Sequence, residues 1–278
     1  MRKPIIAIMY DFDKTLCTKD MQEYGFIPSL GMSAESFWKE SKTLTDSEEM
    51  DGILAYMFTM VDKAKEKKVR VTAKMFKKLG KTVQFFPGVE TWFERINKFA
   101  KKEKVRVEHY IVSSGIKEII LGTKIANEFT RIYACEFMYD HNKSIIWPKC
   151  AVNYTTKTQF LFRINKGVLK IDSESTSKLN DYTPENDRRI PFRNMIYIGD
   201  GLTDVPCMKL VKNNGGRSIA VYDQEKGKQA AQQLLRNGRV NYIVQADYGE
   251  GSEIESIVKA IIRKIHAVEK EISYEIRY

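Results

Sequence analysis

Two pairs of aspartates stand where predicted strands end, and their carboxylates could carry nucleophilic, acid–base or metal chemistry. Asp11 and Asp13 come directly after the first apolar run of the chain. Asp200 and Asp204 follow a later run that begins at Met195, in the sequence Gly-Asp-Gly-Leu-Thr-Asp. A carboxylate can attack an electrophilic centre, move a proton or bind a hard cation such as Mg²⁺. Because open α/β sheets bind ligands at the carboxyl ends of their strands, these side chains predict a site at that edge.

A third predicted strand, residues 105–112, is followed by two hydroxyl side chains, Ser113 and Ser114. Hydroxyl groups can donate hydrogen bonds to phosphoryl oxygens. Three strands that end in acidic or hydroxyl side chains indicate one shared site more strongly than any single motif does.

Short apolar runs of the length of buried strands would position these residues, and helical patterns separate most of them. The predicted strands are residues 5–10, 105–112, 132–139, 195–198, 218–222 and 242–244. Apolar residues recur at helical spacing from Val89 to Phe99 and from Ile254 to Ile265. This alternation predicts an α/β fold with a Rossmann-like, mainly parallel sheet and helices on both faces.

The alternation stops between residues 17 and 86, where apolar spacing predicts about three helices and no strand. A connection of this length next to a site is typical of a lid. We therefore expect a helical cap domain at residues 17–86 and an α/β core made of residues 1–16 and 87–278.

Two shorter segments also interrupt the strand–helix alternation. Residues 140–143, Asp-His-Asn-Lys, have the composition of a turn and predict a β-hairpin between residues 132–139 and 145–153. Residues 170–194 are polar and predict an exposed, partly mobile excursion.

The composition is that of an ordinary globular protein, with 43% apolar and 29% charged residues among 278. A formal net charge of +10 favours acidic partners such as phosphate esters, nucleotides or nucleic acid. The four cysteines form no Cys-x-x-Cys pair, which favours reduced thiols over a zinc site. No apolar stretch approaches the roughly eighteen residues of a membrane span or forms the core of a signal peptide. We expect a cytoplasmic protein with no membrane partner.

The motifs resemble, in order along the whole chain, those of the haloacid dehalogenase superfamily. Residues 11–15, Asp-Phe-Asp-Lys-Thr, match its first motif, and Asp200 with Asp204 matches its fourth, G-D-x-x-x-D. Ser113 stands at the strand-terminal serine of the second motif, and a lysine completes the third. The inserted helices stand where members such as the phosphoserine phosphatases carry a cap.

The resemblance implies a Mg²⁺-dependent phosphatase with a defined role for each aspartate. Asp11 would be the nucleophile that forms an aspartyl-phosphate, and Asp13 would be the general acid and then the general base. Asp11, Asp200 and the backbone carbonyl of Asp13 would bind Mg²⁺. Asp204 would act on the metal through water or by orienting the lysine.

The resemblance also implies a set of phosphate-binding residues. Ser113, favoured over Ser114, and Thr15 would contact the phosphoryl group. For the lysine of the third motif we choose Lys157, because Asn-Tyr-Thr-Thr before it is typical of a capped helix start, and a helix N-terminus attracts phosphate. The remaining candidates for this role are Lys166, Lys170 and Lys178.

Two other functions are compatible with the sequence. A phosphotransferase or phosphomutase would use the same residues but pass the phosphoryl group to a sugar hydroxyl. A non-catalytic basic protein would keep the fold to bind nucleic acid or a protein partner. The basic run at residues 62–81 contains few aromatic residues, so a solvated helix face is favoured over a nucleic-acid surface. A small phosphorylated metabolite is the expected partner, and the oligomeric state is not indicated.

The cap sequence also bears on the substrate. In phosphoserine phosphatases an acid of the cap binds the substrate amino group and an arginine binds the carboxylate. Asp20 could be that acid, but the apolar stretch 50–60 contains no Lys or Arg. A carboxylate desolvated without a charged partner would cost on the order of several kcal/mol. We therefore predict that phosphoserine is a poor substrate and that a sugar or nucleoside phosphate is preferred, with Arg70 as the alternative arginine.

Overall fold

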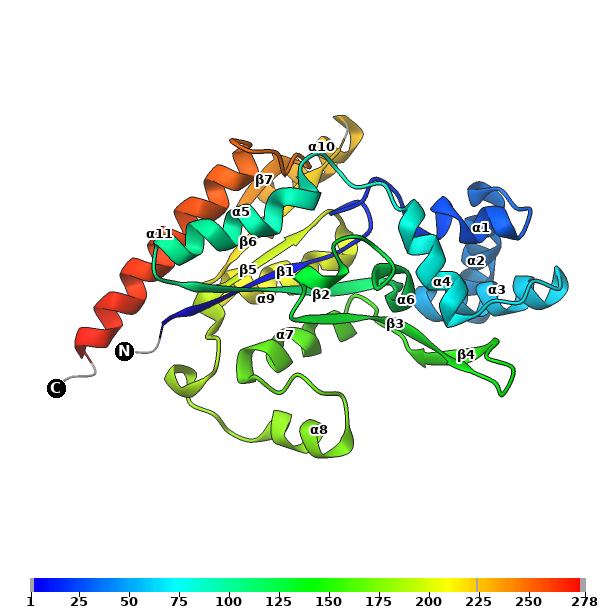
Figure 1. Ribbon diagram of the computed structural model, residues 1–278, viewed down its shortest axis with the longest axis horizontal. Helices are drawn as coiled ribbons and strands as arrows, with labels where there is room; N and C mark the ends of the chain where they lie inside the picture. Colours follow the sequence, from blue (N-terminus) through cyan, green and yellow to red (C-terminus); the bar gives the residue numbers. More distant parts are fainter. Residues whose placement is uncertain (1–2, 224, 276–278) are drawn as a thin grey trace.

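A seven-stranded sheet lies at the centre of the protein, as seen in a computed structural model that describes residues 3–223 and 225–275 (Figure 1). The strands are β1 (Ile5–Tyr10), β2 (Arg106–Ile116), β3 (Arg131–Tyr139), β4 (Ile145–Cys150), β5 (Met195–Gly199), β6 (Arg217–Tyr222) and β7 (Tyr242–Gln245). Their order across the sheet is β4-β3-β2-β1-β5-β6-β7, and only β4 is antiparallel to its neighbour. The prediction of a Rossmann-like, mainly parallel sheet is confirmed.

Helices cover both faces of this sheet, as predicted. Helices α5 (Val89–Lys102) and α11 (Glu253–Glu275) lie on one face, and α7 (Thr156–Lys166) and α9 (Val205–Asn213) lie on the other (Figure 1). The remaining helices of this part of the chain are α6 (Lys117–Ile120), α8 (Ser173–Asn180) and α10 (Glu225–Arg236). The apolar repeats expected to be helical form the buried faces of α5 and α11.

The segment between β1 and α5 is helical and lies beyond one end of the sheet (Figure 1). It contains α1 (Phe26–Ser29), α2 (Ala34–Glu48), α3 (Gly52–Glu66) and α4 (Ala73–Leu79). Helices α2, α3 and α4 each begin after a residue whose side chain accepts from the first turn, namely Ser33, Asp51 and Thr72. These caps satisfy backbone N–H groups that have no partner inside a helix.

Strand β2 is longer than the sequence predicted, and this corrects the placement of the serines. Ser113 and Ser114 lie within its last residues rather than after it, since β2 continues to Ile116. The pairing register with β3 shifts between Val112 and Ile116, so the backbone is irregular at the two serines. Period-two apolar alternation cannot reveal such a bulge, because the extra residue lies inside the strand.

The predicted hairpin is present, and the polar excursion is partly helical. Strands β3 and β4 pair in antiparallel fashion, and Asp140 accepts a hydrogen bond of 2.8 Å from Ser144 N in the turn. The excursion at 170–194 contains α8, which has no buried residue. Both ends of the excursion are fixed to α7, because Arg163 donates to Lys170 O at 2.6 Å and Asn165 donates to Ile190 O at 2.8 Å.

Among the described helices, none combines the length and apolar character needed to cross a bilayer.

Candidate active site

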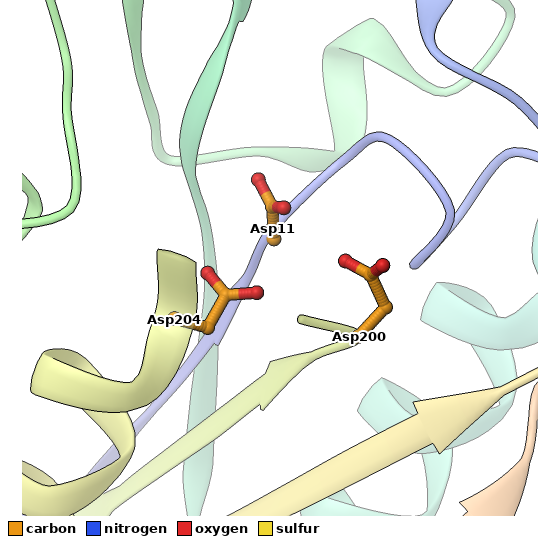
Figure 2. Close-up of side chains that lie close together, drawn as sticks. All are labelled: Asp11, Asp200 and Asp204. Atoms are coloured by element: carbon orange, nitrogen blue, oxygen red, sulfur yellow. The ribbon is translucent and has the colours of Figure 1, made fainter. Parts of the chain in front are cut away.

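Three carboxylates converge at the carboxyl ends of β1 and β5. Asp11 follows β1, Asp200 follows β5, and Asp204 stands just before α9 (Figure 2). One oxygen of each lies within 4.8 Å of the other two. The backbone holds this arrangement in register, since Asp11 N donates to Ile198 O at 2.9 Å. The carboxylates that the sequence placed after two different strands therefore form one cluster.

Lys157 lies inside this cluster and is fully buried. Its Nζ is 2.7 Å from Asp204 Oδ1 and 3.1 Å from Asp11 Oδ1. The hydroxyl of Tyr197, on β5, donates to the same Asp204 oxygen at 2.7 Å. Asp204 thus fixes the lysine and is itself fixed from the sheet. The start of α7 positions the lysine, because Asn153 Oδ1 accepts from Thr156 N at 2.8 Å.

The other lysines considered for this position lie elsewhere. Lys166 donates to the carbonyl of Leu179 at 2.7 Å, and Lys178 pairs with Glu174 on α8. Neither these two nor Lys170 lines the cavity above the aspartates.

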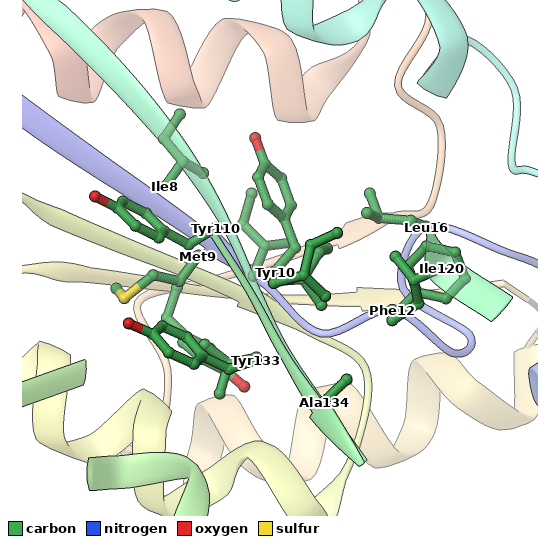
Figure 3. Packing of buried hydrophobic residues seen from close by; sticks show 14 of the residues in the cluster. Ile8, Met9, Tyr10, Phe12, Leu16, Tyr110, Ile120, Tyr133 and Ala134 are labelled. Carbon is green, nitrogen blue, oxygen red and sulfur yellow. The ribbon is translucent and has the colours of Figure 1, made fainter. Parts of the chain in front are cut away.

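Packing around β1 makes the position of Asp11 rigid. All six residues of β1 are buried. Figure 3 shows Ile8, Met9 and Tyr10 among other buried side chains. The Tyr10 hydroxyl accepts from Trp92 Nε1 at 2.8 Å and lies 3.0 Å from His109 Nδ1, so polar contacts fix this side chain as well. Beyond the strand, Phe12 and Leu16 are fully buried. The loop that carries Asp13 is therefore held in place by the buried strand before it and by the buried side chains of Phe12 and Leu16.

Electrostatics in the cluster favour a bound cation. Burial and the charge of Asp204 raise the pKa of Asp11 to about 6, while Lys157 opposes this shift. Burial, followed by the charges of Asp204 and Asp11, raises the pKa of Asp200 well above its ordinary value. Burial lowers the pKa of Lys157, but the two neighbouring carboxylates overcome it and hold that pKa high. Three carboxylates against one ammonium leave a net charge of −2 when all are ionised.

Asp13 lies beside this cluster but is not part of it. Its carboxylate lines the cavity and accepts from Met21 N at 2.8 Å. Burial, followed by the charges of Asp20 and Asp11, raises the pKa of Asp13 well above its ordinary value. A carboxyl group with a raised pKa can hold a proton near neutral pH, as a general acid must.

Thr15 and the two serines have different surroundings. Thr15 is buried, and its hydroxyl points to Asp200 Oδ1 at 3.4 Å. Ser113 is buried, and its Oγ accepts from Gly115 N at 3.0 Å, which leaves its hydroxyl hydrogen free to donate. Ser114 lines the cavity, and its Oγ has no hydrogen-bond partner. Ser114 therefore offers an unused donor to the cavity, whereas Ser113, the serine favoured by the sequence, does not line it.

Gly199 is the residue that lets Asp204 approach the end of β5. A Cβ at this position would collide with the Asp204 carboxylate. Glycine is therefore required at this position of the G-D-x-x-x-D motif, because any side chain would occupy the space of the Asp204 carboxylate.

A cavity of about 890 Å³ lies above the aspartates, between the sheet edge and the helical segment. Asp11, Asp13 and Asp200 line it from the sheet side. From the helical segment it is lined by residues to which the sequence assigned no binding role, among them Gln22, Glu23, Trp38, Lys42, Asp46, Ile53 and Tyr56. Tyr197 was missed as well. A tyrosine in an otherwise aliphatic strand, two residues before the G-D motif, was the available signal.

The chain belongs to the haloacid dehalogenase-like hydrolase family, whose profile matches residues 8–209. An uncharacterized protein of Borreliella burgdorferi is 31% identical over 282 aligned positions, covering 91% of this chain and 95% of the other. The protein is thus a hydrolase of this family.

Two solved structures illustrate the shared fold. A probable phosphoserine phosphatase from Vibrio cholerae has a TM-score of 0.58 at 12% identity, covering 96% of this chain and 67% of the other. A structure described as a phospho-aspartyl intermediate analogue of phosphoserine phosphatase has a TM-score of 0.54 at 14% identity, covering 93% of this chain and 99% of the other. At these identities the likeness concerns the fold.

Proposed function

We propose that the protein is a Mg²⁺-dependent phosphatase that hydrolyses a small phosphate monoester through a phosphorylated Asp11. The convergence of Asp11, Asp200 and Asp204 around Lys157, at the floor of a large cavity, carries this proposal. The related structure with a phospho-aspartyl intermediate analogue supports the covalent route.

The donor set of the site fits Mg²⁺. Asp11 and Asp200 offer hard carboxylate oxygens, which this ion prefers. Asp11 Oδ1 is buried, and its one close cationic neighbour among the described residues is Lys157, whose Nζ lies 3.1 Å away. The net charge of −2 matches a divalent cation. When bound by Asp11, Asp200 and the Asp13 carbonyl, the ion would offset the repulsion between the phosphate and the nucleophile.

The first chemical step transfers the phosphoryl group to Asp11. An oxygen of Asp11 forms a bond to phosphorus as the ester P–O bond breaks, and the carboxyl group of Asp13 gives its proton to the leaving oxygen. In the second step, water transfers a proton to the Asp13 carboxylate while its oxygen attacks phosphorus. This releases inorganic phosphate and restores the Asp11 carboxylate.

Positive charge and hydrogen-bond donors would hold the phosphoryl group during both steps. Lys157, kept protonated by its two carboxylate neighbours, would lie beside the transferred group. Ser113 and Ser114 would donate hydrogen bonds to phosphoryl oxygens. The hydroxyl of Thr15 points to Asp200, so its role would be to orient that carboxylate.

We further propose that the helices of residues 17–86 form a cap that holds the leaving group. Asp20, the candidate for binding an amino group of phosphoserine, is already paired with Lys14 at 2.5 Å. Arg70 donates to the carbonyl of Asn142 in the hairpin turn and does not line the cavity. These contacts support the prediction that phosphoserine is a poor substrate.

Phosphate release from a panel of phosphomonoesters in the presence of Mg²⁺ tests the proposal. We expect turnover of p-nitrophenyl phosphate and of at least one metabolite in the panel. Transfer of the phosphoryl group to an added sugar, without release of phosphate, would instead indicate a phosphotransferase. Activity on no member of a broad panel would favour the binding-protein alternative.

A further inference from the structure

Carboxylates outnumber cations in the wall of the cavity, although the whole chain has a net charge of +10. The acidic residues that line it are Asp11, Asp13, Asp20, Glu23, Asp46 and Asp200, and the basic ones are Lys14 and Lys42. The cavity is therefore unlike the rest of the molecule. Its excess of carboxylates disfavours anionic groups on the part of a ligand that lies away from the proposed metal site.

Most of these carboxylates have a partner or a role in the proposed chemistry. Asp20 pairs with Lys14 at 2.5 Å, and Asp46 pairs with Lys42 at 3.5 Å. The Lys14–Asp20 pair is the closer of the two, whereas the Lys42–Asp46 pair is largely exposed to solvent and therefore weak. Asp11 and Asp200 belong to the proposed metal site, and Asp13 to the proton transfer. Of the six carboxylates that line the cavity, Glu23 is the one with neither a lysine partner nor a role in the proposed chemistry.

Glu23 is held in place without a cation. Its Oε1 accepts a hydrogen bond of 2.9 Å from the indole nitrogen of Trp38, and no salt bridge to it occurs among the described residues. The carboxylate is partly buried and lies in the short 3-10 helix Met21–Tyr24. A partly desolvated carboxylate without a counter-ion favours the binding of a cation from outside.

Two further features beside Glu23 suit the same ligand. The rings of Trp38 and Tyr56 meet edge to face, with centroids 6.0 Å apart, and both line the cavity. Aromatic faces attract ammonium groups. Gln22 also lines the cavity, is 2% exposed, and has an Oε1 without a hydrogen-bond partner. A buried acceptor without a partner destabilises the protein, and an N–H donor on a ligand would remove this cost.

We propose that the leaving group of the substrate carries a protonated primary amine and no carboxylate. This proposal rests on the phosphatase function proposed above. Glu23, oriented by Trp38, binds the ammonium group, and Gln22 Oε1 accepts a hydrogen bond from the same group. A carboxylate on the same leaving group would meet a wall in which carboxylates outnumber lysines. The expected substrates are therefore phosphomonoesters whose leaving group carries an amine.

Matched substrate pairs test this inference. The first pair is 2-aminoethyl phosphate and n-propyl phosphate, which differ by an ammonium in place of a methyl group. The second is glucosamine 6-phosphate and glucose 6-phosphate, which differ by an amine in place of a hydroxyl. We expect the amine to be favoured by at least about fivefold in kcat/KM in one of the pairs, the effect of about 1 kcal/mol.

Two variants show whether Glu23 is responsible for the preference. Glu23→Gln keeps an oxygen for the Trp38 N–H but removes the charge. In this variant the ratio of kcat/KM for the amine to that for its matched substrate should lie within about twofold of unity. Glu35→Gln removes the same charge from the exposed first turn of α2 and should leave the preference as in the wild type. The inference would be wrong if neither pair reached fivefold, or if Glu23→Gln kept the preference.

A binding experiment separates this inference from the proposed function. Isothermal titration of the Asp11→Asn variant with the same four phosphates, in the presence of Mg²⁺, measures recognition without turnover. If the wild-type protein hydrolysed none of the esters but the amine preference persisted in binding, the phosphatase proposal would fail and the amine site would stand. If p-nitrophenyl phosphate were hydrolysed and neither kcat/KM nor binding favoured the amines, only the amine site would fail.

Discussion

Asp51 Oδ2 accepts a hydrogen bond of 2.9 Å from Asn153 Nδ2, and this bond joins the starts of two helices. Asp51 caps α3 through its other oxygen, which accepts from Ile53 N and Leu54 N at 3.0 Å. Asn153 stabilises the start of α7, the helix that carries Lys157. The helical segment over the cavity is therefore tied directly to the helix that holds the lysine in the site.

Replacement of Asp51 by serine should weaken both stability and activity. Serine still caps α3, but its side chain is too short to reach Asn153. Loss of the bond should lower the free energy of unfolding by about 1 kcal/mol, and the loosened contact between α3 and the start of α7 should reduce kcat/KM by at least about twofold. Steady-state kinetics and urea unfolding of the same preparation measure both quantities. Unchanged kinetics would show that the bond has no bearing on the site.

Removal of the metal should abolish activity, and Mg²⁺ should restore it. Asp200→Asn removes a carboxylate ligand and should raise the Mg²⁺ concentration for half-maximal rate by at least about tenfold. The control is Glu174→Gln on the exposed helix α8, which should leave the Mg²⁺ dependence as in the wild type. A rate that persists in excess chelator would exclude the proposed metal site.

His109 should make the protein less stable in mild acid. It is buried between the Tyr10 hydroxyl and Asn97 Oδ1, at 3.0 and 3.1 Å, and burial lowers its pKa from 6.5 to about 3. The unfolded chain therefore binds a proton between these two pKa values that the native state does not, so stability falls as the pH drops below about 6.5. From about pH 7.5 to 5 this amounts to about 2 kcal/mol.

The matched variant for this effect is His109→Gln, which cannot titrate. Urea unfolding at the two pH values should show that the wild-type protein loses about 2 kcal/mol more than the variant does. Equal losses in the two proteins would mean that His109 does not remain neutral in the folded state.

Much of the fold and the acidic part of the site could be predicted from local sequence. Residues 5–10 form β1 as predicted, because a run of apolar residues bounded by polar ones encodes a buried strand. Asp11 and Asp200 could be placed together because parallel strands end at the same edge. Lys157 could be chosen because the residues before it resemble a helix start, and α7 begins at Thr156.

The remaining contacts of the site depend on distant parts of the chain, which local pattern cannot bring together. Glu23 contacts Trp38 because α2 packs beside the 3-10 helix that carries Glu23. The hydroxyl of Tyr56 donates to the Ser114 carbonyl at 2.5 Å, although the two residues are 58 positions apart in the sequence. Tyr197 differs, since its partner Asp204 is only seven residues away and the tyrosine stands out in an otherwise aliphatic strand. Side-chain specificity in the cavity could therefore not be predicted from spacing.

The replacement Asp11→Asn tests the central claim most directly, namely that Asp11 is the nucleophile. The amide is nearly isosteric with the carboxylate but cannot form the phosphorylated intermediate. With the fold verified by circular dichroism and Mg²⁺ present, we expect the rate of phosphate release to fall below about a hundredth of the wild-type rate. A variant that kept more than this fraction, with its amide shown intact by mass spectrometry, would contradict the account.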